Sequence, residues 1–128
     1  MELYEKRLLD RKGLLLKLYF VLEVEQVYLD RNFNIDSLCE KLNVERTTLF
    51  KLVRIRYGLT PFRLIRFLRV NHMKHLIYEN NGEISNLEIL MDSGYRNIGQ
   101  MVSSFKREVG VSLFNYKKKV KKGLNRAC

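Results

Sequence analysis

Apolar residues recur at spacings of three and four along most of this chain, as they do in helices that bury one face. The strict alternation of apolar and polar residues that is typical of strands does not occur. Glycine is sparse and Pro61 is the only proline, so few positions would interrupt a helix. The pattern therefore predicts an all-α fold.

The expected helices are separated by short turns. A charged helical lead-in covers residues 1–12, and a separate helix covers residues 14–30, where the apolar arc is wider than one core face requires. The lysine-rich tail beyond Tyr116 is expected to fray. The remaining expected helices are residues 34–42, 46–57, 61–79, 85–93, 97–109 and 112–116.

Residues that favour helix starts support these boundaries. Asn34 is a candidate cap for the helix that follows it, and Thr60 can cap the helix that begins at Pro61, whose fixed φ suits the first helical position. Ser85 and Glu88 have the spacing of a capping box. These local signals set the register of three helices.

One short skeleton occurs twice, offset by 52 positions. In each copy two apolar residues four apart are followed by a basic residue, a glycine suited to a left-handed helix end, a serine or threonine, and a phenylalanine. The first copy is Leu49, Val53, Arg54, Gly58, Thr60 and Phe62, and the second is Met101, Phe105, Lys106, Gly110, Ser112 and Phe114.

Each copy lies in a short helix, a tight turn and a second helix, which is the helix-turn-helix arrangement. The expected organisation is an N-terminal extension at 1–13, a first helix-turn-helix module at 14–60, a connecting helix at 61–79, a second module at 80–117 and a basic tail at 118–128. The connecting helix would be about 28 Å long, close to the roughly 34–36 Å of one DNA turn. Both second helices are therefore expected to enter successive major grooves.

The net charge of +10 is unevenly distributed. Residues 31–60 contain six basic and three acidic residues, residues 61–80 contain four basic and one acidic, and residues 117–128 contain six basic and no acidic residues. Such a field attracts phosphate polymers, which favours double-stranded DNA over a membrane surface as the partner.

In the first module, the polar face of the second helix offers side chains suited to DNA bases. Arg46 and Lys51 can donate to guanine, Thr47 can pair with either kind of base edge or contact the thymine methyl, and Phe50 can offer only apolar contact. The expected phosphate contacts are Lys41, Arg54 and Arg56. The alternative is that these charges are simply a solvated helix face.

The corresponding face of the second module is chemically milder. Its expected base-facing residues are Gly99, Gln100 and Ser103, and its expected phosphate contacts are Arg96, Lys106 and Arg107.

Other chemistry is not expected. His72 and His75 are three apart, but no third ligand accompanies them, so no metal or other cofactor is predicted. Cys39 and Cys128 are not at metal-ligand spacing and cannot form a disulfide framework, which suggests a reducing cytoplasm. No nucleophile, base and acid constellation indicates an enzyme, and the apolar run Leu14 to Leu22 is too short to span a bilayer.

Two longer segments have a recognisable pattern: NIDSLCEKLNVERTTLFKLVRIRYGLTPFRLIRFLRV and SNLEILMDSGYRNIGQMVSSFKREVGVSLFNYKK. They resemble the DNA-binding domain of the AraC/XylS family of bacterial transcription regulators, over about residues 17–117. The run from Gly94 through Phe105 to Ser112 has the spacing of that family.

The resemblance implies the same base-facing residues in both modules, and Arg69 matches an arginine usual in the connecting helix. Five positions depart from the family pattern: Glu45 replaces a capping serine, Met73 and Leu90 replace alanines, Asn86 replaces an apolar residue, and Leu113 replaces a proline.

The implied function is that of a sequence-specific DNA-binding regulator, an activator acting with RNA polymerase in the cytoplasm, at the nucleoid. The chain would be either a stand-alone regulator or the output domain of something longer. The main alternative is a protein-interaction module or adaptor that keeps the fold and binds a regulator or a polymerase subunit through residues 1–30. The wide apolar arc of residues 14–30 is interpreted as the core helix of the first module, and the alternative is a surface for a partner or for self-association.

Overall fold

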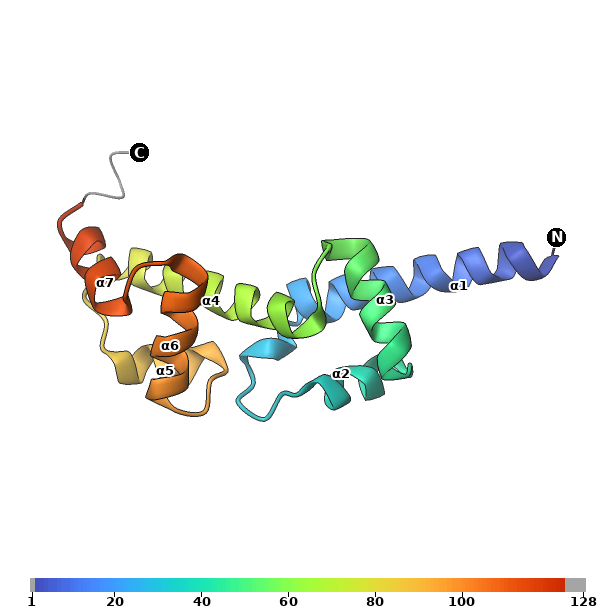
Figure 1. The fold of residues 1–128 in the computed structure, drawn as a ribbon, viewed down its shortest axis with the longest axis horizontal. Helices are drawn as coiled ribbons and strands as arrows, with labels where there is room; N and C mark the ends of the chain where they lie inside the picture. Colours follow the sequence, from blue (N-terminus) through green and yellow to red (C-terminus); the bar gives the residue numbers. More distant parts are fainter. Residues whose placement is uncertain (1, 124–128) are drawn as a thin grey trace. The chain divides into compact units, whose positions relative to one another are not determined.

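The computed structural model describes the backbone of residues 2–123 and the side chains of residues 10–123 (Figure 1). The all-α prediction is confirmed, since the described residues form helices and turns without a strand. The elements in order are α1 (Glu2–Tyr19), a π-helical turn η1 (Phe20–Val24), a 3₁₀ turn η2 (Val27–Leu29), α2 (Ile35–Leu42), α3 (Arg46–Tyr57), α4 (Pro61–Glu79), α5 (Asn86–Ser93), α6 (Ile98–Val109) and α7 (Leu113–Lys121). None of the helices in the described part is long and apolar enough to cross a bilayer.

The chain divides into two compact units. The first unit is Met1–Tyr28 with Phe33–Leu64, and the second is Leu29–Asn32 with Ile65–Cys128. Helix α4 gives its first residues to the first unit and the remainder to the second. Each unit contains one helix-turn-helix pair, α2 with α3 and α5 with α6.

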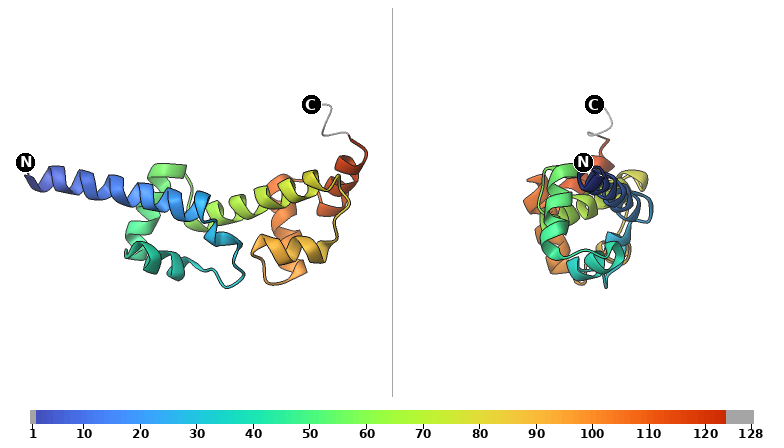
Figure 2. Two further views of the ribbon diagram at one scale, coloured as in Figure 1. Left: turned by 180° about the vertical axis from the view of Figure 1, so that it is seen from behind. Right: turned by 90° about the vertical axis from the view of Figure 1, so that its right-hand side faces the viewer.

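The first unit packs α1 against α2 and α3. Its buried apolar side chains are Leu18, Val21, Leu22, Tyr28, Ile35, Leu38, Cys39, Leu42, Leu49, Leu52, Val53 and Leu64. The N-terminal part of α1 extends past α2 and α3 (Figure 2). Only the C-terminal part of this helix therefore contributes to the core of the unit.

The prediction of a lead-in separate from a helix at 14–30 was wrong. One α-helix runs from Glu2 through Gly13 to Tyr19, because a single glycine inside a helix costs only about 1 kcal/mol and does not break it. The helix does not reach Asp30 either. It passes into η1 and ends at Gln26, whose φ of 54° reverses the chain.

Local signals position α2 and α3 as the sequence predicted. The Asn34 side chain accepts the Ser37 N–H at 2.8 Å, and the Ser37 hydroxyl accepts the Asn34 N–H at 3.1 Å, which completes a capping box. Asn43 forms the turn with a φ of 54°, and Gly58 closes α3 with a φ of 72°. Glu45 makes no side-chain capping bond at the start of α3.

The second unit surrounds its own core. The buried residues are Val70, Met73, Ile77, Ile89, Tyr95, Met101, Phe105, Leu113 and Val120. Asn97 caps α6 by accepting the Gln100 N–H at 2.7 Å, and Ser112 caps α7 by accepting the Asn115 N–H at 3.1 Å. Ser85 caps α5 by accepting the Glu88 N–H at 3.1 Å, which is the serine half of the predicted capping box.

The expectation that the chain frays beyond Tyr116 was wrong for residues 117–121, and residues 124–128 lie outside the described part of the chain. Helix α7 continues to Lys121, and Val120 is buried in the second core. The Lys117 ammonium donates to the Ile84 carbonyl at 2.8 Å and to the Asn86 side-chain oxygen at 2.7 Å. The polar Asn86 is therefore accommodated by a hydrogen bond from α7.

Candidate nucleic-acid interface

Helix α3 separates its apolar and polar residues cleanly. Leu49, Leu52 and Val53 are buried, whereas Thr47, Lys51 and Arg54 lie on the opposite face. Arg46 precedes Leu49 by three residues and Arg56 follows Leu52 by four, so both emerge beside the buried face. Of the predicted DNA-contacting residues on this helix, Arg46, Thr47, Lys51, Arg54 and Arg56 are exposed, and Phe50 is partly buried. The face is therefore basic and open to a polyanion along most of its length.

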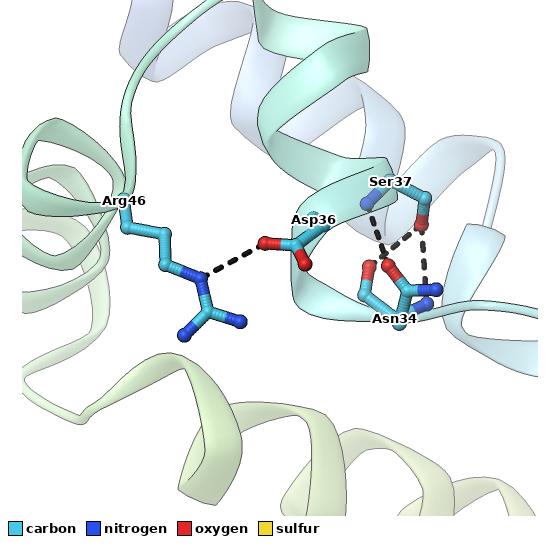
Figure 3. Close-up of polar contacts among 4 residues, drawn as sticks. All are labelled: Asn34, Asp36, Ser37 and Arg46. Atoms are coloured by element: carbon cyan, nitrogen blue, oxygen red, sulfur yellow. Dashed lines mark hydrogen bonds and ion pairs between the residues drawn. The ribbon is translucent and has the colours of Figure 1, made fainter.

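Two residues of this face have partners that the sequence did not indicate. Phe50 meets the ring of Phe62 edge-on, with centroids 6.1 Å apart, so part of its surface is already used. The Arg46 Nε donates to Asp36 Oδ1 at 2.9 Å, which joins the start of α3 to the first turn of α2 (Figure 3). Through this hydrogen bond, the Asp36 carboxylate raises the pKa of Arg46 above its ordinary value.

Two of the predicted phosphate contacts in the first unit are paired with acids. The Lys41 ammonium lies 2.9 Å from the Glu25 carboxylate. The Arg56 guanidinium lies 5.4 Å from the centroid of the Tyr19 ring, with Nη2 3.9 Å from Glu23. A DNA phosphate that binds Lys41 or Arg56 must therefore compete with a carboxylate of the same chain.

Tyr57 is a further polar anchor of α3. Its hydroxyl donates to Glu23 Oε2 at 2.9 Å and ties the end of the helix to η1. Burial, together with this carboxylate, raises the pKa of Tyr57 to about 12. Sequence analysis missed this contact because the two residues are 34 positions apart.

Helix α6 presents a smaller and less basic face. Gly99, Gln100 and Ser103 are exposed there, with Met101 and Phe105 buried behind them. Lys106 and Arg107 are exposed in the last turn. Arg96 precedes the helix and donates from Nε to the Arg31 carbonyl at 3.2 Å, within the second unit.

A basic hollow at the junction of α6 and α7 was not predicted. It has a volume of about 580 Å³, and its lining is rich in lysine. The lining residues are Lys106, Gly110, Val111, Ser112, Asn115, Lys118, Lys119 and Lys122. The run of lysines was visible in the sequence, but only the continuation of α7 turns part of it toward Lys106.

The connecting helix contributes structural contacts to the second unit. The Arg66 Nε donates to Glu108 Oε2 at 2.8 Å, and both side chains are about three-quarters buried. The Arg69 guanidinium lies over the Tyr95 ring, 5.2 Å from its centroid, and burial lowers the pKa of Arg69. These two arginines therefore serve packing between α4 and the second helix-turn-helix.

The surroundings of the two histidines and of Cys39 are as follows. His75 pairs with Glu79 at 2.9 Å, and burial lowers the pKa of His72. Within residues 10–123 no group of three potential ligands lies close enough to hold a metal ion. Cys39 is buried, which raises the pKa of its thiol, while Cys128 lies outside the described residues.

These features define the class of the protein: an all-α, two-module helix-turn-helix protein with a basic helix face in each module. A helix-turn-helix domain model matches residues 38–119, more than half of the chain. The chain belongs to the AraC-type helix-turn-helix family, whose members are DNA-binding transcription regulators.

Solved structures support the fold. The C-terminal domain of AraT, a response regulator from Geobacillus stearothermophilus, is 20% identical with a TM-score of 0.67, over 86% of this chain and 81% of that chain. The C-terminal domain of the two-component response regulator yesN from Fusobacterium nucleatum is 22% identical with a TM-score of 0.66, over 73% of this chain and 89% of that chain. No curated protein sequence matches the chain.

Proposed function

We propose that the protein is a sequence-specific transcription activator that inserts α3 and α6 into successive major grooves of DNA. The observation that carries this proposal is the exposed face of α3, where Arg46, Thr47 and Lys51 lie together on the second helix of a capped helix-turn-helix. Helices in that position contact base edges, and these residue types match the donors and acceptors of the major groove.

The side chains of α3 have distinct proposed roles. Lys51 and Arg46 donate to guanine, Thr47 contacts a thymine methyl or a polar base edge, and Phe50 adds apolar contact from the part of its ring that Phe62 leaves uncovered. Arg54 contacts phosphate directly. Lys41 and Arg56 do so after they exchange Glu25 and Glu23 for phosphate oxygens.

Helix α6 is proposed as the weaker contributor to specificity. Gln100 and Ser103 are its polar base-facing side chains, and Gly99 allows close approach of the backbone. Arg96, Lys106 and Arg107 contact phosphates, which act on every sequence alike. Most of the sequence preference is therefore assigned to the half-site under α3.

Selection of binding sites from random DNA tests this assignment, with Lys51→Ala and Ser103→Ala as a matched pair. A bidentate contact to one base contributes about 1–3 kcal/mol of discrimination. Lys51→Ala is expected to blur one position of one half-site, and Ser103→Ala to lower affinity slightly with the preferred sequence unchanged. A consensus that Ser103→Ala blurs more than Lys51→Ala would contradict the proposed division of roles.

A second function, protein interaction through the N-terminal helix, is favoured by an exposed apolar stripe. Leu16, Phe20 and Val24 follow one another at intervals of four and are exposed by 69%, 49% and 54%. Lys17 and Glu23 lie symmetrically about Phe20, so two antiparallel copies would set each lysine opposite a glutamate. The other proposed partners of this stripe are a regulator or a subunit of RNA polymerase.

Sedimentation at micromolar concentrations distinguishes the partners of the stripe. Self-association predicts a dimer that Phe20→Glu dissociates, while DNA binding by the monomer persists. A monomer at all concentrations would exclude self-association, and a binding experiment with a polymerase subunit would then test the heterologous partner. The proposed cellular location, the cytoplasm at the nucleoid, follows from the DNA-binding function.

A further inference from the structure

The first residue of α3 is held by a side chain of the preceding helix. The N-cap position of α3 is Glu45, which makes no side-chain capping bond, and Arg46 follows it directly. The Arg46 Nε instead donates to Asp36 Oδ1 at 2.9 Å. Asp36 thus reaches across the turn of the helix-turn-helix to the side chain that begins the second helix.

The geometry of this contact leaves one edge of the guanidinium available. A guanidinium presents donors on Nε and on two terminal nitrogens in a fixed planar fork. The Asp36 carboxylate contacts Nε, and Figure 3 shows no contact between it and either terminal nitrogen. Two such parallel donors match O6 and N7 of guanine, the pair of acceptors that arginine contacts most often.

Asp36 belongs to a helix start that is fixed by hydrogen bonds. Asp36 lies in the first turn of α2, directly between Asn34 and Ser37, which close the capping box. The Ser37 hydroxyl also donates to the Asn34 carbonyl at 2.6 Å. An acid in a first turn is favoured by the helix dipole alone, but that effect does not require a bond to Arg46.

Exposure separates a positioning role from a purely structural one. The Arg46 and Asp36 side chains are 57% and 71% exposed, and ion pairs this exposed contribute little to the stability of a fold. Their consequence is orientation. The bond to Asp36 restricts the rotation of the long Arg46 side chain and so fixes the direction in which its terminal nitrogens point.

We infer that Asp36 is a positioning residue for base recognition, which holds Arg46 so that its two terminal nitrogens are directed at one guanine. The inference rests on the proposed function, because it requires Arg46 to face a base. Asp36 itself does not touch the DNA. Its contribution is to the sequence preference at a single base pair and not to the affinity for DNA in general.

The test compares binding-site selections by the wild type, Arg46→Ala, Asp36→Asn and the double variant, each with its melting temperature measured. Arg46→Ala is expected to remove a guanine preference of roughly 5- to 150-fold at one position. Asp36→Asn is expected to weaken the preference at that same position alone. The double variant should be no worse than Arg46→Ala, and melting temperatures should differ little.

A matched control separates positioning from the loss of a negative charge. Glu88 is an exposed acid in the first turn of α5, the corresponding helix of the second unit. Glu88→Gln raises the net charge by the same amount, so it should strengthen binding to all sequences alike and leave every position of the consensus unchanged.

The possible failures are distinguishable. An unchanged consensus for Arg46→Ala would show that Arg46 does not contact a base and would remove the part of the proposed function on which the inference rests. A consensus blurred by Arg46→Ala but not by Asp36→Asn would overturn the inference alone. It would also be overturned if Asp36→Asn changed the preference at a base pair other than the one that Arg46→Ala changes, or strengthened binding to all DNA more than Glu88→Gln does.

Discussion

Gly82, in the turn between α4 and α5, offers the sharpest test of how the second unit is packed. It has a φ of 79°, and its N–H donates to the Ile77 carbonyl at 2.9 Å. A Cβ at this position would lie 2.5 Å from the Lys117 carbonyl oxygen and 2.9 Å from the Lys121 nitrogen. Both are backbone atoms of α7, so the turn or the helix would have to move.

Gly110 is a matched control for Gly82. Its φ is 82°, but a Cβ built on it meets nothing within 4 Å. Alanine in a left-handed conformation costs about 1–2 kcal/mol at either glycine. The difference between the two variants therefore isolates the contact with α7, for which overpacking predicts about 1–3 kcal/mol. In total we expect Gly82→Ala to destabilise by about 2–5 kcal/mol.

Urea unfolding followed by circular dichroism at 222 nm measures both variants, and hydrogen exchange of the α7 amides assigns the change to the second unit. The chain has no tryptophan, so tyrosine fluorescence provides the second optical probe. We expect faster exchange in α7 for Gly82→Ala than for Gly110→Ala. Equal free energies of unfolding for the two variants would refute the close approach of the turn to α7.

Three further predictions concern the contacts described above. Glu108→Ala should destabilise the second unit by about 1–3 kcal/mol in urea unfolding, because it leaves the partly buried Arg66 without this carboxylate; wild-type stability would contradict that. The raised pKa of Tyr57 means that its contribution to stability is complete below pH 10 and is lost as the pH rises toward about 12, so Tyr57→Phe should flatten the decline in the free energy of unfolding between pH 10 and 12. DNA affinity should fall roughly 10³- to 10⁵-fold between 50 and 200 mM salt if about 6–10 phosphates are contacted, and a flat response in a gel-shift titration would favour the protein-interaction function.

Most of the helix boundaries could be predicted from sequence because they depend on local chemistry. Asn34 and Ser112 cap the helices that follow them, and Gly58 and Gly110 close helices with positive φ, as their positions in the sequence indicated. The N-terminal helix was mispredicted because residues 1–12 were taken as a separate lead-in, although the helical backbone continues through Gly13.

The partners of the long side chains could not be predicted in the same way. The exposed faces of α3 and α6 follow from periodicity, but periodicity does not say that Arg56 will lie over Tyr19 or that Lys117 will bond to Asn86. Those partners are set by how helices pack, and they lie tens of residues away in the chain. The sequence therefore predicted which helix faces are exposed, but not that Lys41 and Arg56 are paired with acids.

The ion pairs of Lys41 with Glu25 and of Arg56 with Glu23 affect what a salt titration can count. The slope of affinity against salt concentration arises from the counterions that are released when a basic side chain contacts a DNA phosphate. Lys41 and Arg56 are already neutralised by a carboxylate of the same chain. This carboxylate is not released into solution when DNA binds, and it remains as a nearby negative charge. The number of phosphates deduced from the slope will therefore be smaller than the number of basic side chains that contact the DNA backbone. Removing Glu25 or Glu23 should steepen the slope without adding a single contact.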